Sequence, residues 1–129
     1  MKKDERLVET FAVLRGILER HAKQARVMVD KPDAFQLASP TLVDRTGRPL
    51  FVAAAQIMKS YVSFHLMPVY AIPDLMAEVS PALRKRMQGK ACFNFQTIDS
   101  AQVKELEALT KKGLKQFEKI TVPWSRKSK

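Results

Sequence analysis

The chain has 129 residues, of which 46% are hydrophobic, and its 23 Lys plus Arg outnumber its 13 Asp plus Glu to give a formal net charge of +10. This length matches one domain that can bury its own core. The single cysteine, Cys92, excludes an intrachain disulfide and a zinc ribbon and favours a cytoplasmic protein. No apolar run approaches the ~18 residues of a membrane-spanning helix, so neither membrane insertion nor secretion is expected.

The first half of the chain predicts one helix and then strands. Apolar residues at three- and four-residue steps predict an amphipathic helix over about 5–25. Alternation predicts a short strand near 35–39, and the segment 45–48 predicts a hairpin turn. Two apolar, β-prone runs, 50–57 and 61–67, follow at a separation that suits an antiparallel pair.

The second half predicts two short helices, a strand and a long helix. Pro73 suits the first turn of one short helix, and Ser80 caps another that Gly89 ends. Residues 92–98 alternate as a strand, and Asp99 followed by Gln102 is a capping-box start for the last helix.

This order favours an α+β fold, with an antiparallel sheet of about four to five strands. We expect the N-terminal and C-terminal helices on one face and the two short helices before the last strand. The expected organisation is a single domain over 1–120 and a flexible basic tail over 121–129.

Side-chain alternation predicts a polar sheet face. Tyr61, Ser63 and His65 share one side of their strand, and Asn94 and Gln96 share one side of theirs. If the two strands are neighbours, these polar groups converge. An antiparallel sheet also commonly exposes one polar face to water without binding a ligand.

Basic residues border this polar face in the sequence. The interval between Glu78 and Asp99 contains Arg84, Arg86 and Lys90 and no acid. Guanidinium, imidazole, hydroxyl and amide groups together suit a carboxylate or phosphate. We therefore expect a non-enzymatic domain that binds a small anion, with no cofactor.

Two alternatives remain open. The first is weak, salt-dependent and sequence-independent association with nucleic acid through residues 84–90 and the basic tail. The second is an enzyme that uses Cys92 or His65. No carboxylate lies between Asp44 and Asp74 to orient His65, and Cys92 reads as an inert, partly buried thiol. A metal site is not expected, because the possible ligands are few and scattered.

Three segments resemble, in order and spacing, the YdhG-like family of small bacterial domains of unknown function. They are residues 59–70, the Ser80-Pro81 pair with Leu83, and residues 85–95, within a match that spans roughly 35–117. The resemblance implies a compact α+β fold and a cytoplasmic bacterial protein, and it supplies no substrate or catalytic residue. Some relatives are described as frataxin-like iron chaperones, a role that calls for an acidic surface, whereas the helices and tail here are basic.

Overall fold

The computed structural model describes residues 5–89, 91–119 and 125–127. The helices are α1 (Glu5–Glu19), the 3-10 helix η1 (Ala22–Gln24), α2 (Met67–Ala71), α3 (Pro73–Glu78), α4 (Pro81–Arg84) and α5 (Ser100–Phe117). The strands are β1 (Arg26–Lys31), β2 (Ala34–Asp44), β3 (Pro49–Ile57), β4 (Val62–Leu66), β5 (Met87–Gln88), β6 (Cys92–Phe95) and β7 (Ser125–Lys127).

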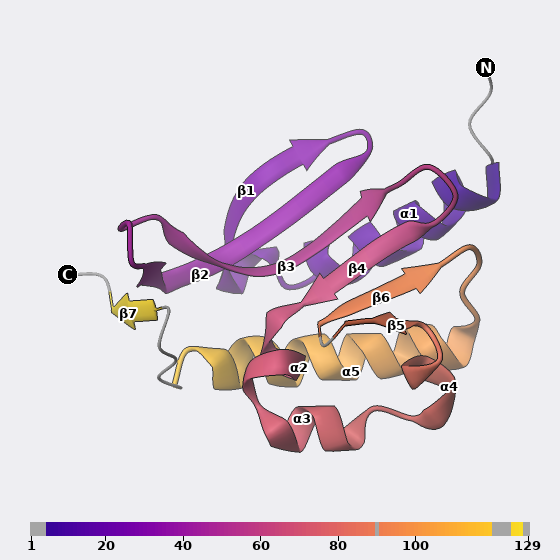
Figure 1. The fold of residues 1–129 in the computed structure, drawn as a ribbon. Helices are drawn as coiled ribbons and strands as arrows, with labels where there is room; N and C mark the ends of the chain where they lie inside the picture. The colour runs from indigo at the N-terminus through magenta and orange to yellow at the C-terminus, as the bar shows by residue number, and fades with distance from the viewer. Residues whose placement is uncertain (1–4, 90, 120–124, 128–129) are drawn as a thin grey trace.

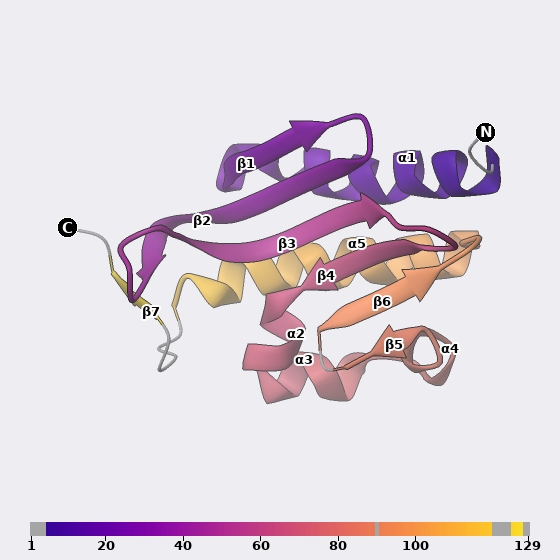
Figure 2. The same ribbon diagram turned by 45° about the horizontal axis from the view of Figure 1, so that its top comes forward.

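The strands form one antiparallel sheet in the order β1-β2-β3-β4-β6-β5, and β7 pairs with β2. Helices α1 and α5 lie together behind the sheet, as Figures 1 and 2 show. The predicted α+β class and the placement of both long helices on one face are confirmed. The sheet has more strands than the four to five expected, and three short helices, rather than two, precede the β5–β6 hairpin.

The sequence pattern does not predict β1, β5 or β7. Most side chains of β1 are exposed, so this strand lacks the alternation of buried and exposed positions that marks a half-buried strand. The expected helix over 5–25 ends earlier, at Glu19, and the chain forms η1 before entering β1.

Strand β2 has two partners along its outer edge. Strand β1 pairs with residues 34–38, and β7 pairs with Leu42–Asp44 further along. The opposite edge of β2 pairs with β3. Of the expected tail, residues 125–127 thus form a strand, and residues 121–124 and 128–129 lie outside the described part.

The hydrophobic core lies between the sheet and the two long helices. The core-facing side chains of β4 (Val62, Phe64 and Leu66) and of β6 (Phe93 and Phe95) are all 0% exposed. Apolar residues of α1 and α5 complete this cluster, which confirms that both helices use their apolar stripes for packing.

The segment after α3 differs from the prediction. Ser80 is an N-cap, as expected, because its side chain accepts a hydrogen bond from Leu83 N at 3.2 Å. However, the helix ends at Arg84, and the chain pairs with β6 as the short strand β5. Gly89 has a φ of 78° in the β5–β6 turn, so its left-handed conformation serves a hairpin and not a helix end.

The end of β6 and the start of α5 are local features. Strand β6 ends at Phe95 and not near residue 98. The predicted capping box is confirmed: Gln102 N donates to Asp99 Oδ1 at 2.8 Å, and Asp99 N donates to Gln102 Oε1 at 3.2 Å.

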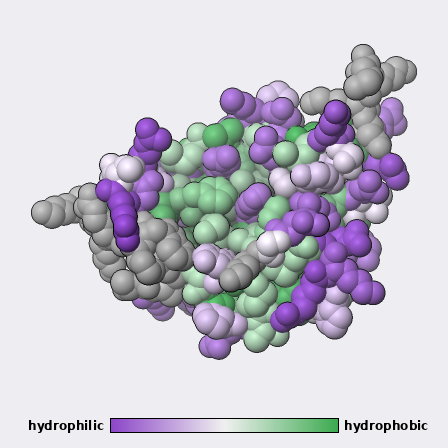
Figure 3. Space-filling view, viewed as in Figure 1, coloured by the Kyte–Doolittle hydropathy of each residue, from purple (hydrophilic) through white to green (hydrophobic). Residues whose placement is uncertain are grey.

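In the view of Figure 3, apolar residues gather near the middle of the surface, and many of the strongly hydrophilic residues lie toward the edges. Within the described residues, no helix combines the length and the hydropathy needed to cross a membrane.

Candidate functional site

Polar side chains line up across neighbouring strands on the face of the sheet that α1 and α5 leave open, here called the open face. Gln56 of β3 pairs with Ser63 of β4, and Ser63 pairs with Asn94 of β6. Side chains at directly paired positions share one face and lie about 5 Å apart. A second cross-strand set, two residues along, consists of Ala54, His65, Cys92 and Gln88.

Two adjoining depressions lie on the open face. One has a volume of about 400 Å³ and the other about 370 Å³, both within the ~300–1,000 Å³ typical of small-molecule sites. They share Gln56, Ser63 and His65. The first is also lined by Met58, Tyr61, Gln88, Cys92 and Asn94, and the second by Gln36, Phe51 and Ala54.

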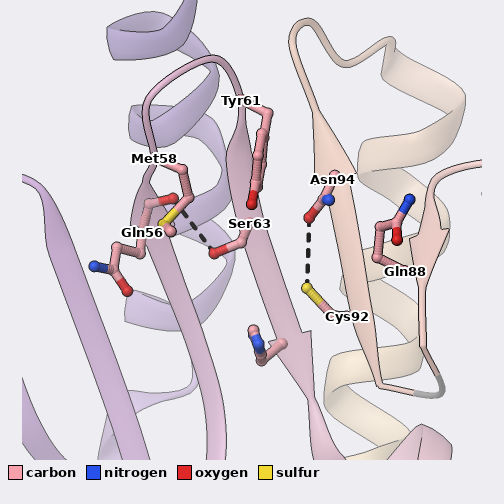
Figure 4. A pocket seen from close by; sticks show the side chains of 8 residues that line it. Gln56, Met58, Tyr61, Ser63, Gln88, Cys92 and Asn94 are labelled. Carbon is pink, nitrogen blue, oxygen red and sulfur yellow. Dashed lines mark hydrogen bonds between the residues drawn. The ribbon is translucent and has the colours of Figure 1, made fainter.

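Figure 4 shows the first depression from close by. Ser63 lies in β4 and Tyr61 directly before it; Gln56 and Met58 lie on one side of them, and Asn94 and Cys92 lie on the other. Most of the site does not depend on a loop, because all of its lining residues except Met58 and Tyr61 lie in adjacent strands. Strand scaffolds of this kind hold binding groups more rigidly than loops do.

Few of these polar groups are used up within the protein. Ser63 Oγ donates to Gln56 O at 3.5 Å, and Cys92 Sγ donates to Asn94 Oδ1 at 3.4 Å. Among the described residues, no hydrogen bond engages the side-chain amide of Gln56 or the imidazole of His65. Hydrogen-bond donors and acceptors therefore remain available on the open face.

The two titratable groups with shifted pKa values on this face are both uncharged near neutral pH. Burial lowers the pKa of His65, so its imidazole is neutral. Burial raises the pKa of the Cys92 thiol, which stays protonated. Of the described residues that line the two depressions, none is an Asp, Glu, Lys or Arg.

Four of the predicted polar residues lie together. Tyr61, Ser63, His65 and Asn94 all line the first depression, because β4 and β6 are direct neighbours. Gln96 lies elsewhere: β6 ends before it, and its Nε2 donates to Ser60 O at 3.2 Å in the turn before β4.

Of the predicted basic residues, the two that the structure describes, Arg84 and Arg86, are not among the described lining residues of the depressions. The Arg84 guanidinium donates to Met76 O at 2.8 Å and to Val79 O at 3.1 Å, and so binds the carbonyl end of α3. Arg86 is exposed and is absent from the described lining residues. Lys90 lies outside the described residues.

Sequence reasoning missed several lining residues. Gln56 follows the run Ala53–Ala54–Ala55, where apolar residues occupy both faces and hide the alternation. Gln88 was expected in a helix, but it lies in β5. For Gln56 a signal was present, because an antiparallel pairing of 50–57 with 61–67 brings it close to Ser63.

The two nucleophilic side chains of the first depression, Cys92 and Ser63, do not have the environment of an activated nucleophile. The Cys92 thiol is protonated and donates to an amide oxygen, and Ser63 Oγ donates to a backbone carbonyl. A catalytic cysteine needs a lowered pKa and a catalytic serine needs an adjacent base. Within the described residues, no group of three or more His, Cys, Asp or Glu side chains is placed to hold a metal ion.

No family model, no curated protein and no solved structure matches the chain. The resemblance to the YdhG-like family therefore stays a prediction.

Proposed function

We propose that this chain is a binding domain whose open face takes a small, uncharged organic molecule with hydrogen-bonding groups. The observation that carries the proposal is the pair of adjoining depressions that share Gln56, Ser63 and His65. A ligand that lies across both depressions faces side chains of five adjacent strands of the sheet, β2, β3, β4, β6 and β5.

Electrostatics favour an uncharged ligand over the anion expected from the sequence. The described lining is amide, hydroxyl, phenol, thiol and neutral imidazole, together with apolar side chains. Among the described residues that line the depressions, an anion moved from water finds no charged partner to offset its lost hydration. Arg84, one of the three basic residues expected to bind the anion, instead donates to carbonyls at the end of α3.

The mixture of groups also favours a planar ring. The rings of Phe51 and His65 lie 6.2 Å apart in an edge-to-face arrangement at the second depression, and Tyr61 lines the first. Aromatic groups offer flat apolar contact area, and the amides of Gln56 and Asn94 offer donors and acceptors at its border.

Matched neutral and anionic probes test the proposal. Nicotinamide and nicotinate share one ring, as do benzamide and benzoate, and the members of each pair differ in an amide against a carboxylate. Titration at millimolar concentration, followed by two-dimensional NMR of the 15N-labelled protein, should shift the amide signals of Ser63, His65 and Asn94 more with the amides.

Variants identify the surface that responds. Gln56→Ala should weaken the response several-fold, and Gln24→Ala, an equal change at an exposed position on η1, should leave it unchanged. The proposal is wrong if all four probes leave the open-face signals unmoved. A stronger response to the carboxylates would reinstate the anion.

A further inference from the structure

The acidic side chains of α5 are drawn into contacts with neighbouring elements. Glu105 accepts hydrogen bonds from Ser80 N at 2.7 Å and from Ser80 Oγ at 2.6 Å. Glu107 pairs with Arg20 and lies 2.7 Å from His21 Nε2 at the end of α1. Both carboxylates are therefore turned toward other parts of the fold.

The acid that follows α5 is engaged in the same way. Ser39 Oγ donates to both carboxylate oxygens of Glu118, at 2.8 and 2.7 Å, and the hydroxyl of Thr41 donates to one of them. This contact ties the end of α5 to β2. Each acid of the segment 100–119, namely Glu105, Glu107 and Glu118, therefore bonds to a residue outside that segment.

The lysines of this segment, in contrast, lie on the exposed side. Lys104, Lys111 and Lys115 fall within roughly 40° of one another around the helix, and Lys119 follows one turn later. All four are exposed, and within the described residues none of them forms a salt bridge. We call these four residues the lysine row; its first three members span roughly 16 Å.

Lys112, beside the lysine row, is neutralised by an acidic side chain of another helix. Its Nζ lies 3.0 Å from both carboxylate oxygens of Glu78 on α3. Lys112 is therefore neutralised, whereas the lysine row has no acidic partner among the described residues. The lysine row is a local concentration of positive charge.

We propose that the lysine row binds the phosphate backbone of nucleic acid without reading its sequence. Charge complementarity favours an extended polyanion, because lysines spaced one or two helical turns apart along one face can each neutralise a separate phosphate. A lipid surface fits less well, because a helix that lies in a membrane interface inserts its apolar face, and the apolar face of α5 is buried in the core.

This surface is separate from the open face. Helix α5 lies on the opposite side of the sheet from the two depressions (Figure 2). The surface expected from the sequence consisted of residues 84–90 and the basic tail, whereas the lysine row lies between these two segments. Within the first of them, Arg84 is occupied.

A salt titration tests the inference on the full chain. Fluorescence anisotropy of a labelled 20-base-pair duplex measures the binding constant at several salt concentrations. Four lysines that each neutralise one phosphate contribute about −3.6 to the slope of log K against log salt. Lys111→Gln combined with Lys115→Gln should reduce the slope by about 1.8 and weaken binding at least tenfold at low salt.

A matched control separates the lysine row from net charge. Lys31→Gln combined with Lys59→Gln removes the same charge at exposed positions beside the strand turns, and it should weaken binding less than threefold. Circular dichroism confirms that each variant keeps its helix content. Equal losses in the two double variants, or no binding of the wild type at low salt, would overturn the inference.

Anionic vesicles test whether the lysine row binds a membrane surface instead. Vesicles that contain phosphatidylserine, at the same total phosphate concentration, should bind more weakly than the duplex. Tighter binding to vesicles, with the same loss in Lys111→Gln/Lys115→Gln, would assign the row to a membrane surface and overturn the nucleic-acid inference.

Discussion

The two faces of the sheet use the same strands for different purposes. In β4, Phe64 faces the helices and is 0% exposed, whereas its neighbours Ser63 and His65 face the open side. In β6, Phe93 is fully buried beside Asn94, which lines a depression. Alternate residues therefore face the core and the proposed binding surface, and a substitution at one parity should leave the other surface largely intact.

The largest contrast is expected between adjacent residues of β4. Phe64→Ala should lower the free energy of unfolding by about 3–5 kcal/mol, because it leaves a cavity in a fully buried site. His65→Ala should cost about 1 kcal/mol or less, because the imidazole is partly exposed and contacts Phe51 only edge-on. Urea denaturation measures both values, and similar losses would contradict this division between the faces.

Two glycines sharpen the comparison on the helix side. A Cβ at Gly113 of α5 would lie 2.9 Å from the Cβ of Pro68, so Gly113→Ala should destabilise the fold by about 1–2 kcal/mol despite the helix preference of alanine.

At Gly16 of α1 the nearest atom to a Cβ would be an Arg20 side-chain nitrogen at 3.5 Å, an ordinary contact. Gly16→Ala should therefore stabilise the protein by about 0.5–1 kcal/mol. Thermal unfolding gives the sign of each change. If Gly113→Ala stabilises the protein instead, α2 can move away from α5 without a loss of stability.

The smallest expected effect concerns the protonation of His65. Burial lowers the pKa of this imidazole in the folded protein, so the unfolded chain binds its proton first as the pH falls. Stability should therefore decline as the pH drops below about 6.5, the ordinary pKa of histidine. Its cross-strand partners, Ala54 and Cys92, carry no charge at that pH.

His65→Gln should remove this part of the pH dependence. Urea denaturation of both proteins at several pH values measures it, and contributions that the two proteins share cancel in the difference. Parallel stability profiles for the wild type and the variant between neutral pH and pH 5 would show that burial does not disfavour the charged imidazole.

Local patterns were enough to predict much of the fold and part of the site. Alternation within one strand depends only on the geometry of that strand, so Tyr61, Ser63 and His65 were assigned to one face, and Asn94 could be matched to them. The capping box at Asp99 is equally local and was found from sequence.

What the sequence could not predict depends on pairing and on where elements end. Gln96 continues the alternation of β6, but the strand has already ended, so its side chain bonds to a turn. The local sequence of residues 85–88 favours a helix, but pairing with β6 makes Met87 and Gln88 the strand β5. The position of Arg84 depended on the carbonyl end of α3, which no periodicity in the sequence indicates.

The shared outer edge of β2 bears on self-association. Strand β1 protects one stretch of that edge, and β7, from the far end of the chain, protects the next. Unpaired strand edges are templates for pairing between molecules. A chain shortened before residue 125 should therefore reveal its defect as oligomers or aggregates that grow with protein concentration, while its thermal unfolding stays close to that of the intact protein.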